Sequence, residues 1–271
     1  MSERAGRFAA SGVVTLTTDF GLRDPFVGVM KGQLLVRFRE VRIVDLTHEV
    51  LAHWPAEAGF WLARAFRYFP PGTVHVAVVD PGVGTARDIA IVECEGHVFL
   101  APDNGLLGSV IEDAEAITLR RMAPGALARI HVGSPSATFH GRDIFAPMAA
   151  ELAAGRIQPS DLGPVVPELI PGWLEEPVVG QGQVTGSIVT VDHFGNLITN
   201  IDARLLDGIP HAVVRAAGKE MPLRRTYADV RPGDYLALVN SFGVVEIARA
   251  EQSAAEGLGL DRGAPVTIVH R

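Results

Sequence analysis

The first half of the chain alternates between short apolar runs and segments with helical periodicity. The runs 13–17, 41–46 and 74–79 are rich in β-branched residues, as is typical of buried strands. Apolar residues recur three and four positions apart over 25–38 and 55–68, which predicts two amphipathic helices between those strands. Strands that alternate with helices favour right-handed crossovers and a largely parallel sheet.

Further along, the pattern predicts a hairpin and a third helix. Segments 89–94 and 97–100 are apolar and are joined by Glu95-Gly96, which indicates an antiparallel pair. A helix is expected over 144–154, with His140 just before its start. Asp24 is the expected N-terminal cap of the first helix.

The second half has a different texture. Prolines are frequent after residue 155, and helical periodicity is lost until residue 182. We therefore predict an N-terminal α/β domain over 12–158, a linker over 159–182, and a smaller all-β, barrel-like C-terminal domain over 183–271. The expected strands of that domain are 183–192, 212–216, 235–239, 244–248 and 266–269.

Composition narrows the classes of partner. The chain has 271 residues and a net charge of −7 with scattered Lys and Arg, so we expect neither nucleic acid nor membrane as a partner. No run reaches the ~18 apolar residues of a spanning helix. Residues 1–11 carry no apolar segment typical of a signal peptide, and Cys94 is a lone cysteine. These features predict a cytoplasmic protein that acts on a small molecule.

Polar residues follow the predicted strands at their carboxyl ends. Asp19 and Asp80 each end a strand, and Arg87 lies beyond the Gly-rich turn that Asp80 begins. That edge of an open α/β sheet is where ligands bind, although a strand-ending Asp can also simply cap a turn. No HxxxH, HxH or DxD pair is present, so zinc is not expected, whereas Mg²⁺ held mainly by a substrate stays open. The motifs GxGxxG, GxxxxGKS/T and GxSxG are also absent, which argues against dehydrogenases, P-loop proteins and α/β-hydrolases.

Seven motifs, in order, carry a family resemblance that extends from about residue 13 to 269. They are Leu-Thr-Thr-Asp-Phe-Gly (16–21), Asp-Leu-Thr-His-Glu-Val (45–50), Val-Asp-Pro-Gly-Val-Gly-Thr (79–85), Ala-Pro-Asp-Asn-Gly-Leu-Leu (101–107), Thr-Phe-His-Gly-Arg-Asp (138–143), Asp-His-Phe-Gly-Asn-Leu-Ile-Thr-Asn (192–200) and Val-Asn-Ser-Phe-Gly (239–243). This set resembles the S-adenosyl-L-methionine (SAM) hydroxide adenosyltransferases, which are SAM hydrolases related to the fluorinases and chlorinases.

The resemblance implies a function and a set of catalytic residues. Members of this family use water or hydroxide to displace methionine from C5′ of the ribose, giving adenosine and L-methionine. They need no cofactor or metal, and they form homotrimers with substrate sites between subunits. The Asp, Arg and His of the hydrolytic members match Asp80, Arg87 and His140.

The resemblance also implies substrate-binding positions. Asp19 matches the residue that binds the two ribose hydroxyls, and Tyr227 is the best aromatic residue for stacking on adenine. The other matched positions are Asp192 and Ser241 near the methionine amine and carboxylate, Asn196 at the adenosine moiety, the backbone of Ser253 and Ala254 at the adenine edge, and Glu246 nearby.

Two alternatives and two departures accompany this interpretation. A halogenating relative would make 5′-halo-adenosine, but the residues Asp80, Arg87 and His140 favour hydrolysis. A non-catalytic adenosine- or SAM-binding protein is the other alternative. Phe242 stands where a halogenating relative offers an Arg to the methionine carboxylate, and either His53 or Trp54 occupies the place of an aromatic residue over the substrate.

Overall fold

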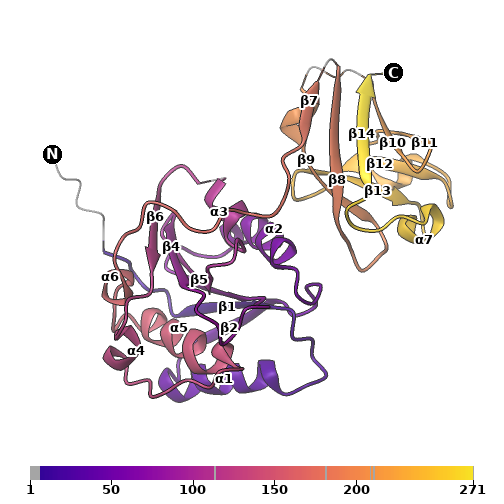
Figure 1. Ribbon diagram of the computed structural model, residues 1–271. Helices are drawn as coiled ribbons and strands as arrows, with labels where there is room; N and C mark the ends of the chain where they lie inside the picture. The colour runs from indigo at the N-terminus through magenta and orange to yellow at the C-terminus, as the bar shows by residue number, and fades with distance from the viewer. Residues whose placement is uncertain (1–6, 113, 181, 208, 210, 271) are drawn as a thin grey trace. The chain divides into compact units, whose positions relative to one another are not determined.

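A computed structural model describes residues 7–112, 114–180, 182–207, 209 and 211–270. The chain folds into two compact units that divide between Trp173 and Leu174 (Figure 1). This division lies inside the segment 159–182 that the sequence predicts as a linker. Helix α6 (Pro159–Leu162) lies in the first unit, and strand β7 (Val178–Gly180) pairs with a strand of the second unit.

The first unit is built on one sheet that is largely parallel, as predicted. The sheet has the strand order β2-β1-β3-β5-β4-β6, and the pairs β1–β2, β1–β3 and β3–β5 are parallel. Strands β4 and β6 add an antiparallel edge. The strands are β1 (Val13–Thr18), β2 (Arg42–Thr47), β3 (Val74–Val78), β4 (Ile89–Cys94), β5 (His97–Pro102) and β6 (Ile117–Arg121).

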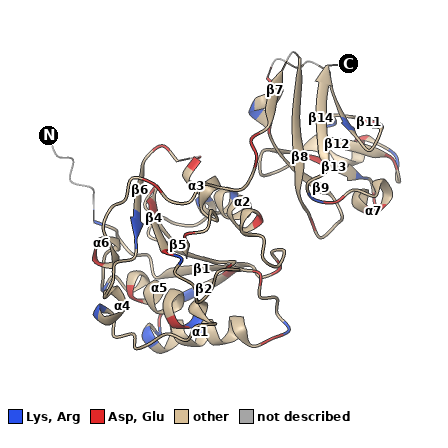
Figure 2. Cartoon of the chain, viewed as in Figure 1, with Lys and Arg blue, Asp and Glu red and all other residues tan. Residues whose placement is uncertain are grey.

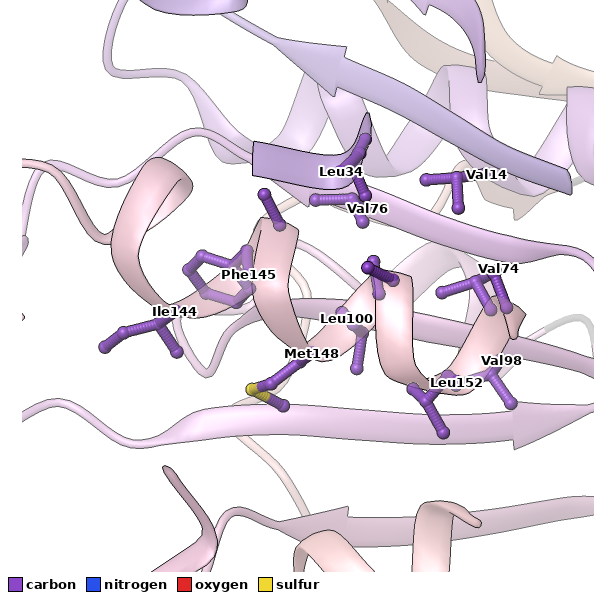
Figure 3. Close-up of a cluster of buried hydrophobic side chains, with 14 of the residues drawn as sticks. Val14, Leu34, Val74, Val76, Val98, Leu100, Ile144, Phe145, Met148 and Leu152 are labelled. Carbon is purple, nitrogen blue, oxygen red and sulfur yellow. The ribbon is translucent and has the colours of Figure 1, made fainter. Parts of the chain in front are cut away.

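Helices cover both faces of this sheet, so the central strands β1, β3 and β5 are buried on both sides, whereas the edge strands β2 and β6 are partly exposed. On one face, α1 (Phe26–Arg37) and α5 (Ala146–Ala153) cover the side of the sheet where Val74 and Val76 of β3 meet Leu34 and Met148 (Figure 3). On the other face, α2 (Pro55–Ala65) and α3 (Gly108–Glu112) pack on Ala77 and its neighbours. Burial on both faces explains why β3 is apolar at every position except His75.

The predicted hairpin is confirmed. Strands β4 and β5 pair in antiparallel register from Cys94 opposite His97 to Ile89 opposite Pro102. Glu95 (φ 49°) and Gly96 (φ 80°) both take positive φ, as a tight two-residue hairpin loop requires.

Details at three helix ends differ from the sequence predictions. Pro25, not Asp24, is the residue that precedes α1, and it makes no side-chain cap, so the capping prediction for Asp24 is wrong. Helix α2 ends at Ala65 and continues as one 3₁₀ turn, Phe66–Tyr68. The predicted helix 144–154 begins earlier, as a π-helical turn over Gly141–Phe145 that leads into α5.

The second unit is the predicted β-barrel. Its strands follow one another in the order β11-β10-β14-β8-β9-β13-β12. The two ends of this path meet, since Leu223 bridges Ala237 and the N–H of Arg224 donates to the Ala237 carbonyl at 2.7 Å. The strands are β8 (Gln183–Val191), β9 (Leu197–Asp202), β10 (Ala212–Ala216), β11 (Lys219–Pro222), β12 (Tyr235–Val239), β13 (Val244–Arg249) and β14 (Pro265–His270), with the short helix α7 (Ala254–Leu258).

The charged residues do not gather on one element. Figure 2 shows basic and acidic positions interspersed over each unit, in keeping with the scattered charge of the sequence. In the part of the chain that the structure describes, no helix has the length and apolar character to cross a membrane.

Candidate active site

A sharp turn follows strand β3 and begins with the candidate carboxylate Asp80. Gly84 in this turn has φ +78°, and a Cβ there would lie only 2.1 Å from the carbonyl oxygen of Ala137. Glycine is therefore required for the turn to pack against that segment. The start of the turn is held by Asn104, whose Nδ2 donates to the carbonyl of Val79 at 2.9 Å.

The structure brings the three predicted catalytic side chains together beside this turn. The Nε of Arg87 lies 2.9 Å from each carboxylate oxygen of Asp80, and its Nη2 donates to Oδ2 as well. The same Nη2 lies 2.8 Å from Nδ1 of His140. Only 4% of the Asp80 side chain and 10% of the Arg87 side chain are exposed, so this ion pair is largely removed from water.

Arg87 also determines which nitrogen of His140 carries the hydrogen. A guanidinium can only donate, so Nδ1 of His140 accepts and the neutral ring carries its hydrogen on Nε2. Burial lowers the pKa of His140, and the charge of Arg87 lowers it further, against the opposing effect of Asp80 and Asp143. His140 is therefore neutral near pH 7 and presents an N–H donor at Nε2.

Asp80 and His140 line a cavity of about 290 Å³, and Asp19 lines the same cavity. This volume is at the lower end of the range for ligand pockets, about 300–1,000 Å³. The Oδ2 of Asp19 accepts the backbone N–H of His53 at 2.9 Å. His53, with a positive φ of 66°, lines the cavity, whereas Trp54 is not among the lining residues. Of His53 and Trp54, it is therefore His53 that faces this cavity.

The rest of this cavity wall is aromatic. Phe20, Phe26 and Phe139 pack edge to face, with ring centroids 5.4–6.2 Å apart, and all three line the cavity. The sequence alone did not predict a role for these rings. Phe20 follows Asp19 and Phe139 precedes His140. Their places next to two candidate polar residues could have predicted that these rings line the same cavity. The site combines a few charged groups with an apolar wall.

A second cavity, of about 520 Å³, lies in the β-barrel unit and is lined by Tyr227, Asn196 and Ser253 among others. The turn that carries Asn196 packs closely on Ser253, because Gly195 has no Cβ: one would lie 2.3 Å from the Ser253 Oγ. Tyr227 is 47% exposed and lines this cavity, so part of the residue is open to a ligand. Three of the predicted adenosine-binding residues therefore share one pocket.

Two of the predicted carboxylates are used mainly within the protein. Asp192 accepts hydrogen bonds from the N–H of Phe194 and from both the N–H and Nδ2 of Asn196, all at 2.9 Å, which fixes the turn. Glu246 is 3% exposed and accepts from Tyr227 Oη at 2.6 Å and from Asn240 Nδ2 at 3.2 Å. Burial raises the pKa of Glu246 despite these donors. Glu246 therefore orients the Tyr227 ring and does not line the cavity.

The remaining two predicted positions do not line this cavity either. Ser241 is exposed in the turn between β12 and β13. Ala254 is fully buried as a whole residue in the barrel core. The assignment of both residues to substrate binding stays a prediction.

The described residues offer no obvious metal centre. Among them, no group of three or more His, Cys, Asp and Glu side chains is placed to hold a metal ion. The groups that converge at the first cavity are instead one carboxylate locked to an arginine, one neutral imidazole and one further carboxylate. Such a set can orient a polar nucleophile beside a bound sugar.

Comparisons with known proteins define the family. Residues 14–163 match the SAM hydroxide adenosyltransferase N-terminal domain, and residues 186–267 match the corresponding C-terminal domain. The chain belongs to the SAM hydroxide adenosyltransferase family. It is 38% identical over 260 residues to the (R)-S-adenosyl-L-methionine hydrolase of Thermus thermophilus, covering 94% of this chain and 99% of that protein.

Two further proteins resemble this chain, one in sequence and one in structure. A fluorinase of an Actinoplanes species is 29% identical, with 94% of this chain and 97% of that protein covered. A crystal structure of an uncharacterized conserved protein from Thermotoga maritima superposes with a TM-score of 0.87 at 35% identity, covering 95% and 99% of the two chains. Fluorinases are thus more distant from this chain than the named hydrolases.

Proposed function

We propose that this protein hydrolyses SAM to adenosine and L-methionine by attack of water on C5′ of the ribose. The observation that carries the proposal is the Asp80–Arg87–His140 arrangement beside a cavity that also contains Asp19. Membership of the family and the names of the hydrolase relatives support it. The second cavity, with Tyr227 and Asn196, supplies the groups expected to bind adenine.

The hydrogen-bond donors and acceptors at the site support the role that we propose for each catalytic residue. His140 presents Nε2–H and so donates to the oxygen of the attacking water, while Oδ1 of Asp80, which accepts only one hydrogen bond from Arg87, keeps a lone pair that accepts the proton of that water. Arg87 does not line the cavity, but its hydrogen bonds fix the positions of the Asp80 and His140 side chains. Asp80 is thus the proton acceptor, and His140 is a donor and not a base.

The electron and charge balance fits an apolar pocket. The C5′–O bond forms as the C5′–S bond breaks, the electron pair goes to sulfur, and the proton of water goes to Asp80. A cationic sulfonium and a carboxylate become a neutral thioether and a carboxylic acid, so charge disappears along the reaction. The ring wall of Phe20, Phe26 and Phe139 excludes water and favours that loss of charge.

The proposal is tested by incubating the purified protein with SAM and separating the products, with and without chloride or fluoride. Adenosine and methionine in equal amounts, independent of halide, are the expected result. Halide-dependent 5′-halo-adenosine would identify a halogenase instead. Bound but unchanged SAM would identify a non-catalytic binding protein.

The pH dependence of kcat/KM tests the roles of Asp80 and His140. Because the pKa of His140 is below its usual 6.5, kcat/KM is expected to stay level from pH 8 down to 6.5 and to fall only in more acidic solution. In His140→Asn, the amide oxygen still accepts from Arg87 and cannot be protonated, so the part of the fall due to His140 should vanish. A continuous tenfold rise per pH unit between pH 6.5 and 9 would contradict these roles and indicate a bound hydroxide as nucleophile.

Three further statements belong to the same proposal. In this proposal the reaction needs no cofactor or metal, because the sulfonium leaves as a neutral thioether without acid assistance; dialysis against a chelator should leave turnover unchanged. The functional assembly is a homotrimer with substrate sites between subunits, and sedimentation should give three times the chain mass. A cytoplasmic location accords with the buried, unpaired Cys94.

A further inference from the structure

The carboxylate that faces the ribose in our proposal, Asp19, is carried by a short loop after β1. This loop is tied to the loop after β2 by two backbone groups. The N–H of Gly21 donates to the carbonyl of His48 at 2.8 Å, and the N–H of His53 donates to Asp19 Oδ2 at 2.9 Å. The position of Asp19 therefore depends on how the second loop is fixed.

A buried histidine joins the same two loops through its side chain. His48 is 4% exposed, and its Nδ1 lies 2.8 Å from the Oγ1 of Thr18, which is fully buried. Thr18 Oγ1 in turn accepts the N–H of Phe20 at 3.2 Å. The side-chain contact thus reaches the residues on both sides of Asp19.

The other side of the imidazole faces a charged pair. His48 Nε2 lies 3.1 Å from Asp45 Oδ1, a close contact that is not well aligned for a hydrogen bond, and Lys31 of α1 donates to Asp45 Oδ2. Burial raises the pKa of Asp45, but Lys31 and His48 lower it by more, so the carboxylate is ionised. An ionised carboxylate beside Nε2 favours a hydrogen there, and Nδ1 then accepts the Thr18 hydroxyl hydrogen.

We infer that His48 is a positioning residue: through Thr18 it holds Asp19 in the orientation that receives the ribose 2′- and 3′-hydroxyls. Asp45 fixes the tautomer that makes this possible. The inference rests on the proposed function, since it assigns a task to the loop that carries Asp19. Thr18 directly precedes two cavity-lining residues, Asp19 and Phe20, so a shift of Thr18 would move the carboxylate that faces the ribose.

The test compares how well variants distinguish adenosine from 2′-deoxyadenosine, with both dissociation constants measured by calorimetry. Thr18→Val keeps the side-chain shape and removes the hydroxyl, whereas Thr18→Ser keeps the hydroxyl. The measured quantity is the dissociation constant of 2′-deoxyadenosine divided by that of adenosine. We expect this ratio to fall at least fivefold in Thr18→Val, towards the ratio of Asp19→Asn, and to stay near the wild-type ratio in Thr18→Ser. If the contact between His48 and Thr18 were purely structural, Thr18→Val would weaken the binding of both nucleosides alike and leave the ratio unchanged.

Two further variants keep the test decisive if Thr18→Val does not fold. Asp45→Asn alters a partly exposed residue and is expected to lower the ratio at least twofold, and His48→Asn more strongly. When Asp19 is already replaced by Asn, neither Asp45→Asn nor His48→Asn should lower the ratio further. Folded variants with the wild-type ratio would overturn the inference while wild-type hydrolysis of SAM stands. A wild-type protein that neither binds adenosine nor hydrolyses SAM would overturn the proposed function and this inference together.

Discussion

Replacing Arg87 by Lys is expected to lower kcat for SAM hydrolysis by at least about 100-fold while leaving the affinity for adenosine nearly unchanged. A lysine ammonium cannot hold both oxygens of Asp80 and donate to His140 Nδ1 at once, as the guanidinium does. His140 would then be free to change tautomer, and the water would lose its donor. Because Arg87 does not line the cavity, binding of the product should not depend on it.

The matched control is Arg67→Lys. Arg67, in the 3₁₀ turn Phe66–Tyr68, makes a similar pair, with Nε 3.0 Å and Nη2 2.6 Å from the carboxylate of Glu95, but this pair is partly exposed and does not line the cavity. The Arg67→Lys variant should therefore keep the full wild-type turnover. Equal loss of adenosine affinity and turnover in Arg87→Lys would show that Arg87 is scaffolding for the whole pocket and not a part of the catalytic set.

The second large effect concerns stability in acid. His75 lies in the core of the first unit, with Nδ1 2.8 Å from Thr15 Oγ1, Nε2 3.1 Å from His97 Nδ1, and its ring stacked on Phe99. Burial lowers the pKa of His75 to about 3, and the neighbouring His97 adds to this. The unfolded chain binds a proton near pH 6.5 and the folded chain does not.

The free energy of unfolding should therefore fall as the pH drops from 6.5 towards 3. The loss from His75 is about 1.4 kcal/mol per pH unit, or about 2 kcal/mol at pH 5, and none above pH 6.5. Urea unfolding at pH 7.5 and pH 5.0 measures it. His75→Gln should lose about 2 kcal/mol less between the two pH values than the wild type, whereas the exposed His131→Gln should behave as the wild type. An equal loss in all three proteins would contradict the assignment.

The main elements of the fold could be predicted from the sequence because their signals are local. Strand β3 is a continuous apolar run, and the hairpin at Glu95-Gly96 depends on two residues that accept positive φ. Strand β6 (Ile117–Arg121) was not predicted, because all of its residues are only half-buried and its pattern carries little apolar signal. Strand β9 (Leu197–Asp202) begins within the family motif 192–200, whose polar residues obscured its alternation.

The candidate site was accessible only in part. Asp80 and Arg87 could be paired from their places around one turn, but His140 joins them from a distant segment, and only the family resemblance connected the three. The approach of that segment depends on Gly84 and on a π-helical turn, Gly141–Phe145, which no periodicity predicts. The burial of Glu246 behind Tyr227 is likewise a property of barrel closure and not of local sequence.

The most direct measurement of the central claim is the fate of oxygen from labelled water. SAM is incubated with the protein in 18O-labelled water, and the products are analysed by mass spectrometry. Attack of water on C5′ predicts one 18O atom in the 5′-hydroxyl of adenosine and none in methionine. Label in any other product, such as a ribose freed from adenine or a homoserine, would show that a different bond of SAM is broken and would contradict the proposed reaction.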